Sequence, residues 1–103
     1  DMESYTRRVF SMFGGKQKRV SIRFINQLLD TAIERFGTSS DVFYRKDDEK
    51  HFVVTADVEV SDQFFAWVCG FRKRAAIINP PDVVESMKKF LEDIETRYQD
   101  DEN

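Results

Sequence analysis

The residues best placed to do chemistry are arginines in alternating stretches of the chain, and the chemistry they suit is anion binding. Arg19 and Arg23 are four positions apart in one such stretch, and Phe43 stands two positions before Arg45 in another. Side chains two or four positions apart in a strand lie on the same face of a sheet. Guanidinium groups pair with phosphates, and an aromatic ring can stack on a base. We therefore predict that Arg19, Arg23, Phe43 and Arg45 line a ligand-binding or nucleic-acid-binding surface.

A second basic run, Arg72-Lys73-Arg74, supplies two further candidate ligand contacts, Arg72 and Arg74. This run opens the fourth predicted strand, whereas Lys16-Gln17-Lys18-Arg19 opens the first, and these two strands are expected to run in opposite directions. The two basic runs should therefore lie at opposite ends of the sheet. Each could still contact a different segment of one extended ligand.

An alternative explanation for the strand arginines is ordinary cross-strand ion pairing. Asp57 and Glu59 lie on a strand expected beside the one that carries Arg19 and Arg23, and opposite charges on neighbouring strands attract one another. The formal net charge is −3, which argues against a free-standing nucleic-acid-binding domain because such domains usually carry a basic excess. The aromatic signature of RRM domains is also absent at His51-Phe52-Val53-Val54. The residues alone leave both explanations open.

Catalysis and metal binding have little support. The chain has one histidine, His51, and one cysteine, Cys69, so neither a zinc-like ligand pair nor a Ser/His/Asp triad with a placed nucleophile can be assembled. Gly14-Gly15-Lys16 lacks the strand-to-helix context of a phosphate-binding loop. We therefore predict no catalytic residue, no cofactor and no metal, and we expect Cys69 to be a small buried apolar group. No apolar run approaches the ~18 residues of a membrane helix, so no membrane partner is expected.

Periodic patterns and chain breakers predict four strands and three helices. Asn26 and Ser61 are the expected N-terminal caps of the first two helices, and Gly37 is expected to end the first. The predicted strands cover residues 18–25, 41–46, 52–60 and 75–78, the helices follow Asn26, Ser61 and Pro81, and residues 38–40 and 47–50 form a loop and a hairpin turn. The last helix carries a continuous apolar stripe, made of Val83, Val84, Met87, Phe90, Leu91, Ile94 and Tyr98.

This element order predicts an α+β fold, a ferredoxin-like βαββαβ sandwich with a four-stranded antiparallel sheet and an extra C-terminal helix. The first and third strands should lie side by side in the centre, with two helices on one face of the sheet and the other face open. We assign residues 1–17 to an N-terminal arm or linker, residues 18–100 to the ferredoxin-like domain and residues 101–103 to an acidic tail.

The order and spacing of several short segments resemble one known family. The segments are Met12-Phe13-Gly14-Gly15, Glu34-Arg35-Phe36-Gly37, Val58-Glu59-Val60-Ser61, Phe65-Ala66-Trp67-Val68, Gly70-Phe71 and Ile78-Asn79-Pro80. From about Tyr5 to Tyr98 the chain resembles the C-terminal extension of WYL-domain transcriptional regulators, called the WCX domain. The family pattern commonly has a second glycine after Gly70-Phe71, where this chain has Arg72.

The resemblance implies a bacterial, cytoplasmic regulator. Its other parts would be a winged-helix DNA-binding domain and a WYL domain, neither of which is recognisable here, and residues 1–17 would be the arm that leads from the WYL domain. The resemblance further implies a homodimer and an effector site, with effectors that include single-stranded nucleic acids. We therefore expect a non-catalytic regulatory domain that supports dimerisation and effector sensing.

Two other functions stay open at this point. One is a purely structural dimerisation module, which would need an apolar open sheet face, and Phe43, Val53 and Ile78 are the residues that would form it. The other is a module that senses an amino acid or another small molecule. An acylphosphatase-like enzyme is disfavoured, because Ile25-Asn26-Gln27 leads into a helix without the glycines of a phosphate-cradling loop.

Overall fold

The computed structural model describes residues 15–99 of the chain. Most of the predicted arm and the whole predicted acidic tail lie outside these residues. The described elements in chain order are β1 (Lys16–Ile25), the 3-10 turn η1 (Asn26–Leu28), α2 (Leu29–Phe36), β2 (Phe43–Lys46), β3 (His51–Val60), α3 (Asp62–Cys69), the 3-10 turn η2 (Arg72–Arg74), β4 (Ala75–Asn79) and α4 (Pro81–Arg97).

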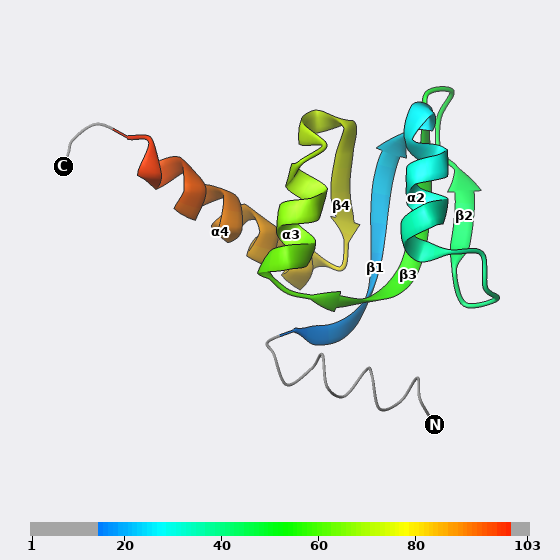
Figure 1. Cartoon of the computed structure of the whole chain (residues 1–103), viewed down its shortest axis with the longest axis horizontal. Coiled ribbons are helices and arrows are strands. Elements are labelled where there is room, and N and C mark those ends of the chain that lie inside the picture. Colours follow the sequence, from blue (N-terminus) through cyan, green and yellow to red (C-terminus); the bar gives the residue numbers. More distant parts are fainter. Residues whose placement is uncertain (1–14, 100–103) are drawn as a thin grey trace.

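The four strands form one antiparallel sheet in the order β2-β3-β1-β4. The two central strands pair along their whole length, from Lys16 opposite Val60 to Ile25 opposite His51. Helices α2 and α3 lie on one face of this sheet, and α4 leaves the body after β4 (Figure 1). The predicted α+β class, strand directions and central pair are therefore confirmed.

The core lies between the sheet and the helices α2 and α3, and aromatic rings fill much of it. Phe24 on β1 is fully buried. Its ring stacks on Phe52 at a centroid distance of 5.4 Å and meets Trp67 and Phe71 edge-on at 6.1 and 6.0 Å. Because period-two alternation in β1 and β3 turns one side of each strand toward α3, the apolar positions of the sequence become one continuous layer.

Of the two predicted helix caps, one is confirmed and one is wrong. The backbone N–H of Phe64 donates to Ser61 Oγ at 3.2 Å, so Ser61 caps α3 as predicted. Asn26 makes no cap, because its side-chain amide donates to the carbonyl oxygen of Glu49 and its backbone N–H to that of Lys50, both at 2.9 Å. Asn26 therefore ties the end of β1 to the β2–β3 turn.

Two further expectations are corrected. Cys69 is only partly buried, because the sides of α3 that face the core carry Phe64, Phe65 and Val68 instead. The second strand begins at Phe43 rather than at residue 41. Residues 39–42 form a turn instead, in which Val42 N–H donates to the Ser39 carbonyl oxygen at 3.0 Å.

The backbone at Arg72 has a positive φ of 60°, at the turn between α3 and β4. A left-handed conformation costs a residue with a Cβ about 1–2 kcal/mol, and glycine avoids this cost. The position is the one where the family pattern commonly has a glycine. The backbone at this position is therefore strained, because arginine has a Cβ and glycine does not.

Replacing Arg72 with glycine is expected to raise the free energy of unfolding by about 1 kcal/mol. Urea titration would show this as a higher midpoint. Lys73→Gly is the matched control, because Lys73 lies in the same turn without a positive φ and should lose stability. Equal losses in the two glycine variants would show that the backbone at Arg72 is not strained.

Candidate ligand-binding face

The predicted arginine surface forms on the face of the sheet opposite α2 and α3, which we call the open face. The strand register aligns Arg45, Val53 and Arg23 in one row across β2, β3 and β1. The neighbouring row contains Phe43, Thr55 and Ser21. The prediction that Phe43 and Arg45 face the same way as Arg23 is therefore correct.

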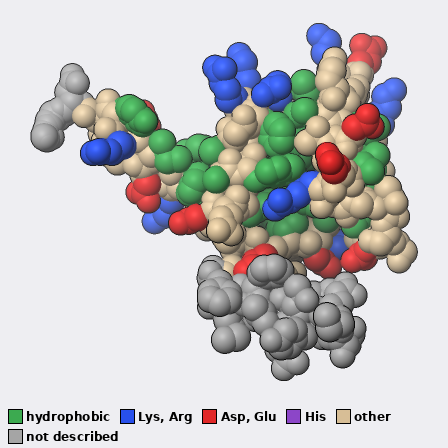
Figure 2. All heavy atoms as spheres, viewed as in Figure 1, with side chains coloured by type: hydrophobic (Ala, Val, Ile, Leu, Met, Phe, Trp, Pro, Cys, Tyr) green, Lys and Arg blue, Asp and Glu red, His purple; other side chains and the backbone are tan. Residues whose placement is uncertain are grey.

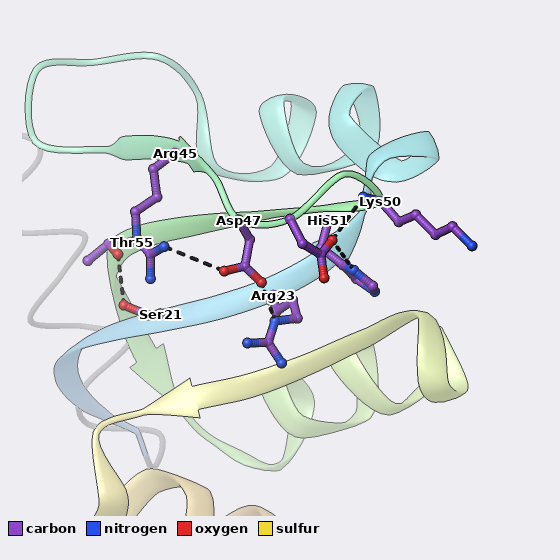
Figure 3. Close-up of polar contacts among 8 residues, drawn as sticks. Ser21, Arg23, Arg45, Asp47, Lys50, His51 and Thr55 are labelled. Atoms are coloured by element: carbon purple, nitrogen blue, oxygen red, sulfur yellow. Dashed lines mark hydrogen bonds and ion pairs between the residues drawn. The ribbon is translucent and has the colours of Figure 1, made fainter.

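A single carboxylate lies between two of these arginines. Arg23 Nε donates to Asp47 Oδ2 at 2.8 Å, and Arg45 Nη1 lies 3.8 Å from Asp47 Oδ1 (Figure 3). Val53, between the two arginines in the row, is fully buried although it belongs to the open face. Two guanidinium groups and one carboxylate leave this row with an excess positive charge, and the Asp47 carboxylate occupies a position between the arginines that suits an anion.

Arg19 is held by different partners further along β1. Its Nη1 donates to Asp57 Oδ1 at 3.1 Å and its Nη2 to the Asp41 carbonyl oxygen at 2.9 Å. Its guanidinium carbon also lies 5.4 Å from the centroid of the Phe43 ring. The cross-strand ion pair between Arg19 and Asp57 is as the alternative explanation predicts. Arg23 pairs with Asp47 instead, because the register places Arg23 opposite Val53.

The open face is mainly polar apart from Phe43. The hydroxyl groups of Ser21 and Thr55 are 2.7 Å apart in a hydrogen bond between the central strands (Figure 3). Phe43 is 58% exposed, whereas Val53 is fully buried and Ile78 is half-buried. One exposed ring does not make an apolar surface that a second copy could bury, so the open face fits a polar ligand better than a sheet-to-sheet dimer.

The second basic run lies away from these rows. Arg72 and Arg74 lie in η2, just before Ala75, which pairs with Phe24 near the end of β1, whereas Lys16 begins β1 opposite Val60. The two basic runs are therefore at opposite ends of the sheet, as predicted. Basic side chains project at the α3–β4 end in Figure 2. Arg74 Nε donates to the Phe71 carbonyl oxygen at 3.1 Å, which ties that side chain to its own turn.

Comparison with known families now identifies the type of domain. Residues 17–94 match the family model of the WCX domain. This chain belongs to the WCX domain family. The WCX domain is the C-terminal domain of WYL-type transcriptional regulators, a regulatory domain family with no known catalysis.

No curated protein and no solved structure matches this WCX domain. The open face is therefore a candidate site by its own geometry alone. Within residues 15–99, no helix is long and apolar enough to cross a membrane. The same residues contain no cluster of three side chains of the types that bind metals.

Asp47 is the residue of the candidate site that the sequence pattern does not single out, because the pattern predicts it only as part of the charged hairpin turn. Asp47 stands two positions after Arg45, and continued alternation would have placed it on the same face. The next carboxylate in the turn, that of Asp48, contacts residues at the end of the turn itself and not the arginines. Asp48 Oδ1 lies 2.8 Å from His51 Nδ1 and accepts from the backbone N–H of Lys50. The pKa of the Asp48 carboxyl is lowered from its ordinary value, chiefly by the hydrogen bond with His51.

Tyr44 lies on the opposite, core-facing side of β2. Its hydroxyl donates to the Gly37 carbonyl oxygen at 2.7 Å, which fixes the end of α2 against the sheet. Burial raises the pKa of the Tyr44 hydroxyl above its ordinary value. Tyr44 therefore holds β2, the strand that carries Phe43 and Arg45, in place.

A further ion pair joins β1 to the start of α4. Lys18 Nζ lies 2.9 Å from Asp82 Oδ2, in an open hollow that Lys16 and Ser86 also line. The hydrogen bond from Lys18 is the main reason why the pKa of Asp82 is lowered, and the backbone N–H of Val83 adds to it.

Replacing Lys18 with methionine is expected to raise the pKa of Asp82 toward its ordinary value of about 3.9. Because the folded-state pKa is lowered, Asp82 stabilises the domain above the unfolded pKa, and this contribution is lost as the pH falls through the folded pKa. The stability difference between wild type and Lys18→Met should therefore shrink in acid. Carboxyl NMR titration would measure the pKa, with Lys16→Met as control. An unchanged Asp82 pKa in Lys18→Met would show that Lys18 is not the main cause of the lowered pKa.

Proposed function

We propose that this WCX domain is the regulatory C-terminal domain of a bacterial, cytoplasmic WYL-type regulator, in which it supports homodimerisation and binds an anionic effector on its open face. The effector class that suits the face is a short single-stranded nucleic acid. The observation that carries this proposal is the pair Arg23 and Arg45, which share the carboxylate of Asp47 above the buried Val53. Effector binding on this face would act on the WYL and winged-helix DNA-binding domains of the same full-length protein.

The chemistry of the face favours phosphate groups. Guanidinium groups bind phosphate oxygens through paired N–H donors. A phosphate that displaced Asp47 would meet both Arg23 and Arg45, with Arg45 62% exposed and Arg23 45% exposed in their side chains. The exposed ring of Phe43 lies in the next row and can stack on a base. Phosphate contacts and one stacking ring suit a nucleic acid without demanding a particular sequence.

We further propose that the fold is of the ferredoxin-like class. The elements follow the order βαββαβ, and the sheet order is β2-β3-β1-β4 with antiparallel pairs throughout. The extra helix α4 follows this unit. This class leaves one sheet face free for a ligand, which is where the arginines lie.

The test is oligonucleotide binding by a charge-matched set of variants. The double variant Arg23→Gln/Arg45→Gln should bind a short fluorescent single-stranded DNA at least about tenfold more weakly, because it can no longer pair two guanidinium groups with phosphates. The slope of affinity against salt concentration should also decrease, by about one for each phosphate that is no longer neutralised. The control is Lys46→Gln/Lys50→Gln, which removes the same charge from neighbouring positions. Equal affinities for the two double variants would rule out a site on the open face.

A second candidate function is a structural dimerisation domain without a ligand. The observation that favours it is that Arg19, Arg23 and Arg45 each have an acidic partner. A dimer whose sedimentation is unaffected by the oligonucleotide at low salt would support this second function over effector binding.

A further inference from the structure

Helix α4 carries apolar side chains beyond the part of it that packs on the domain. Val83 in its first turn is buried, and Val84, Met87 and Phe90 pack partly against the core. The ring of Phe90 lies 5.5 Å from that of Phe65 on α3. These contacts hold the first half of α4 and leave the second half to project from the body (Figure 1).

The second half of the helix continues the same stripe without a described partner. Leu91, Ile94 and Tyr98 are 43%, 42% and 84% exposed. Apolar side chains appear on the projecting helix in Figure 2. Residues three, four and seven positions apart lie on one side of a helix, so these side chains extend the line of Met87 and Phe90. A continuous exposed apolar stripe of this kind marks an interaction surface.

We propose that this stripe binds the same stripe of a second copy of the chain, with the two α4 helices antiparallel and crossing near Leu91. The inference rests on the dimerisation part of the proposed function and names its surface. The polar open face, with Val53 buried and only Phe43 well exposed, does not offer a comparable apolar area. The helix is therefore the better self-association surface.

The charges beside the stripe select the second copy as the partner. Lys88 and Glu95 are seven residues apart, which is nearly two helical turns, so they lie on the same side of the stripe. An antiparallel pair centred between residues 91 and 92 places Lys88 of each copy opposite Glu95 of the other. A parallel pair would turn Lys88 toward the other flank of the partner's stripe, where Asp93 lies, and would bring both domain bodies to the same end of the helices (Figure 1). A two-fold axis makes the favourable contact twice, as an isologous interface requires.

The pairing also matches the apolar residues. In the same register, Leu91 lies by the two-fold axis, and Ile94 of one copy falls opposite residue 89 of the other, next to Phe90. Exposed ion pairs contribute little to affinity but decide the orientation of paired helices. The apolar contacts supply the affinity, and the Lys88–Glu95 pairs fix the antiparallel register.

The first experiment is sedimentation equilibrium of the 103-residue chain over a range of concentrations. Leu91→Glu should raise the dimer dissociation constant about a hundredfold or more, because two carboxylates enter the centre of the interface. Thr96→Glu is the matched control: it adds the same charge on the opposite side of α4 and should leave the dimer nearly unchanged. Circular dichroism of both variants checks that the fold is retained.

The second experiment tests the register by exchanging charges. Lys88→Glu and Glu95→Lys should each weaken the dimer about fivefold, since each brings like charges together at two places. The double variant Lys88→Glu/Glu95→Lys should restore the wild-type dissociation constant. Failure of the double variant to recover would overturn the antiparallel register.

Two outcomes separate this inference from the proposed function. A Leu91→Glu chain that still dimerises like wild type would overturn the helix interface and leave dimerisation through another surface standing. A wild-type chain that is monomeric at every concentration would overturn both the interface and the dimerisation role. Oligonucleotide affinity, measured on the same variants, reports on the open face separately from either result.

Discussion

Replacing Phe24 with alanine is expected to lower the free energy of unfolding by about 3–5 kcal/mol. Phe24 is fully buried and contacts three aromatic rings, those of Phe52, Trp67 and Phe71. Alanine would leave a cavity that the rings of a strand, a helix and the turn after it cannot all move to fill. Domains of this size have a total stability of about 5–15 kcal/mol, so the variant should be close to unfolding.

Urea denaturation followed by circular dichroism would measure this loss. Phe43→Ala is the matched control, because it removes the same side chain from an exposed position of the same sheet. The control should cost less than about 1 kcal/mol, mainly because the ring no longer lies against the Arg19 guanidinium. Similar losses in the two variants would mean that the aromatic cluster does not form the centre of the core.

Replacing Asp47 with asparagine is expected to raise the affinity for short single-stranded DNA about tenfold, which corresponds to about 1.4 kcal/mol. In the wild type an incoming phosphate must displace the carboxylate that Arg23 and Arg45 share. The amide of asparagine can still accept from Arg23, but it carries no charge to compete with a phosphate. The variant should therefore keep the turn and expose a more positive site.

Asp48→Asn is the control for the Asp47 variant. Asp48 is the next residue in the same turn, but its carboxylate faces His51 rather than the arginines. Both substitutions remove one negative charge, so long-range electrostatics change by similar amounts. Fluorescence anisotropy with labelled DNA at several salt concentrations would separate them. If both variants gained affinity equally, the Asp47 carboxylate would not be a competitor for the site.

The Asp47 carboxylate would also influence which anions the proposed site can bind. A carboxylate that neutralises a binding site in the absence of ligand sets a threshold for binding, because only an anion with several contacts can replace it. A nucleic acid meets that requirement better than a single small anion, since it adds phosphate contacts and base stacking. The threshold would help the regulator ignore free phosphate.

The local sequence correctly predicted features that depend on residue periodicity. Alternation in residues 18–25 and 52–60 placed the apolar side chains in the core and Arg19 and Arg23 on the open face. Ser61 was identified as a cap because its hydroxyl reaches a backbone N–H only three residues away. The match of the chain to the WCX family bears out the resemblance seen in its short segments.

Predictions that depended on distant partners were less successful. Asn26 has the residue type of a cap, but the β2–β3 turn takes its hydrogen bonds. Cys69 lies in an apolar helix, but the way α3 docks on the sheet leaves the thiol partly exposed. Strand alternation also could not name Asp47 as the partner of Arg23, because that contact depends on how the hairpin returns over β3.

The sequence by itself determined which side chains share a face, because the backbone of a strand or helix fixes that direction locally. It determined the order of the elements and, through the spacing of its short segments, the family. Only the tertiary structure decided which charges meet and how far the stripe of α4 is covered. The stripe is continuous in sequence from Val83 to Tyr98, yet its cover stops after Phe90, because α4 is packed only at its first half. Register and docking angle join residues far apart in the chain, and no local pattern contains them.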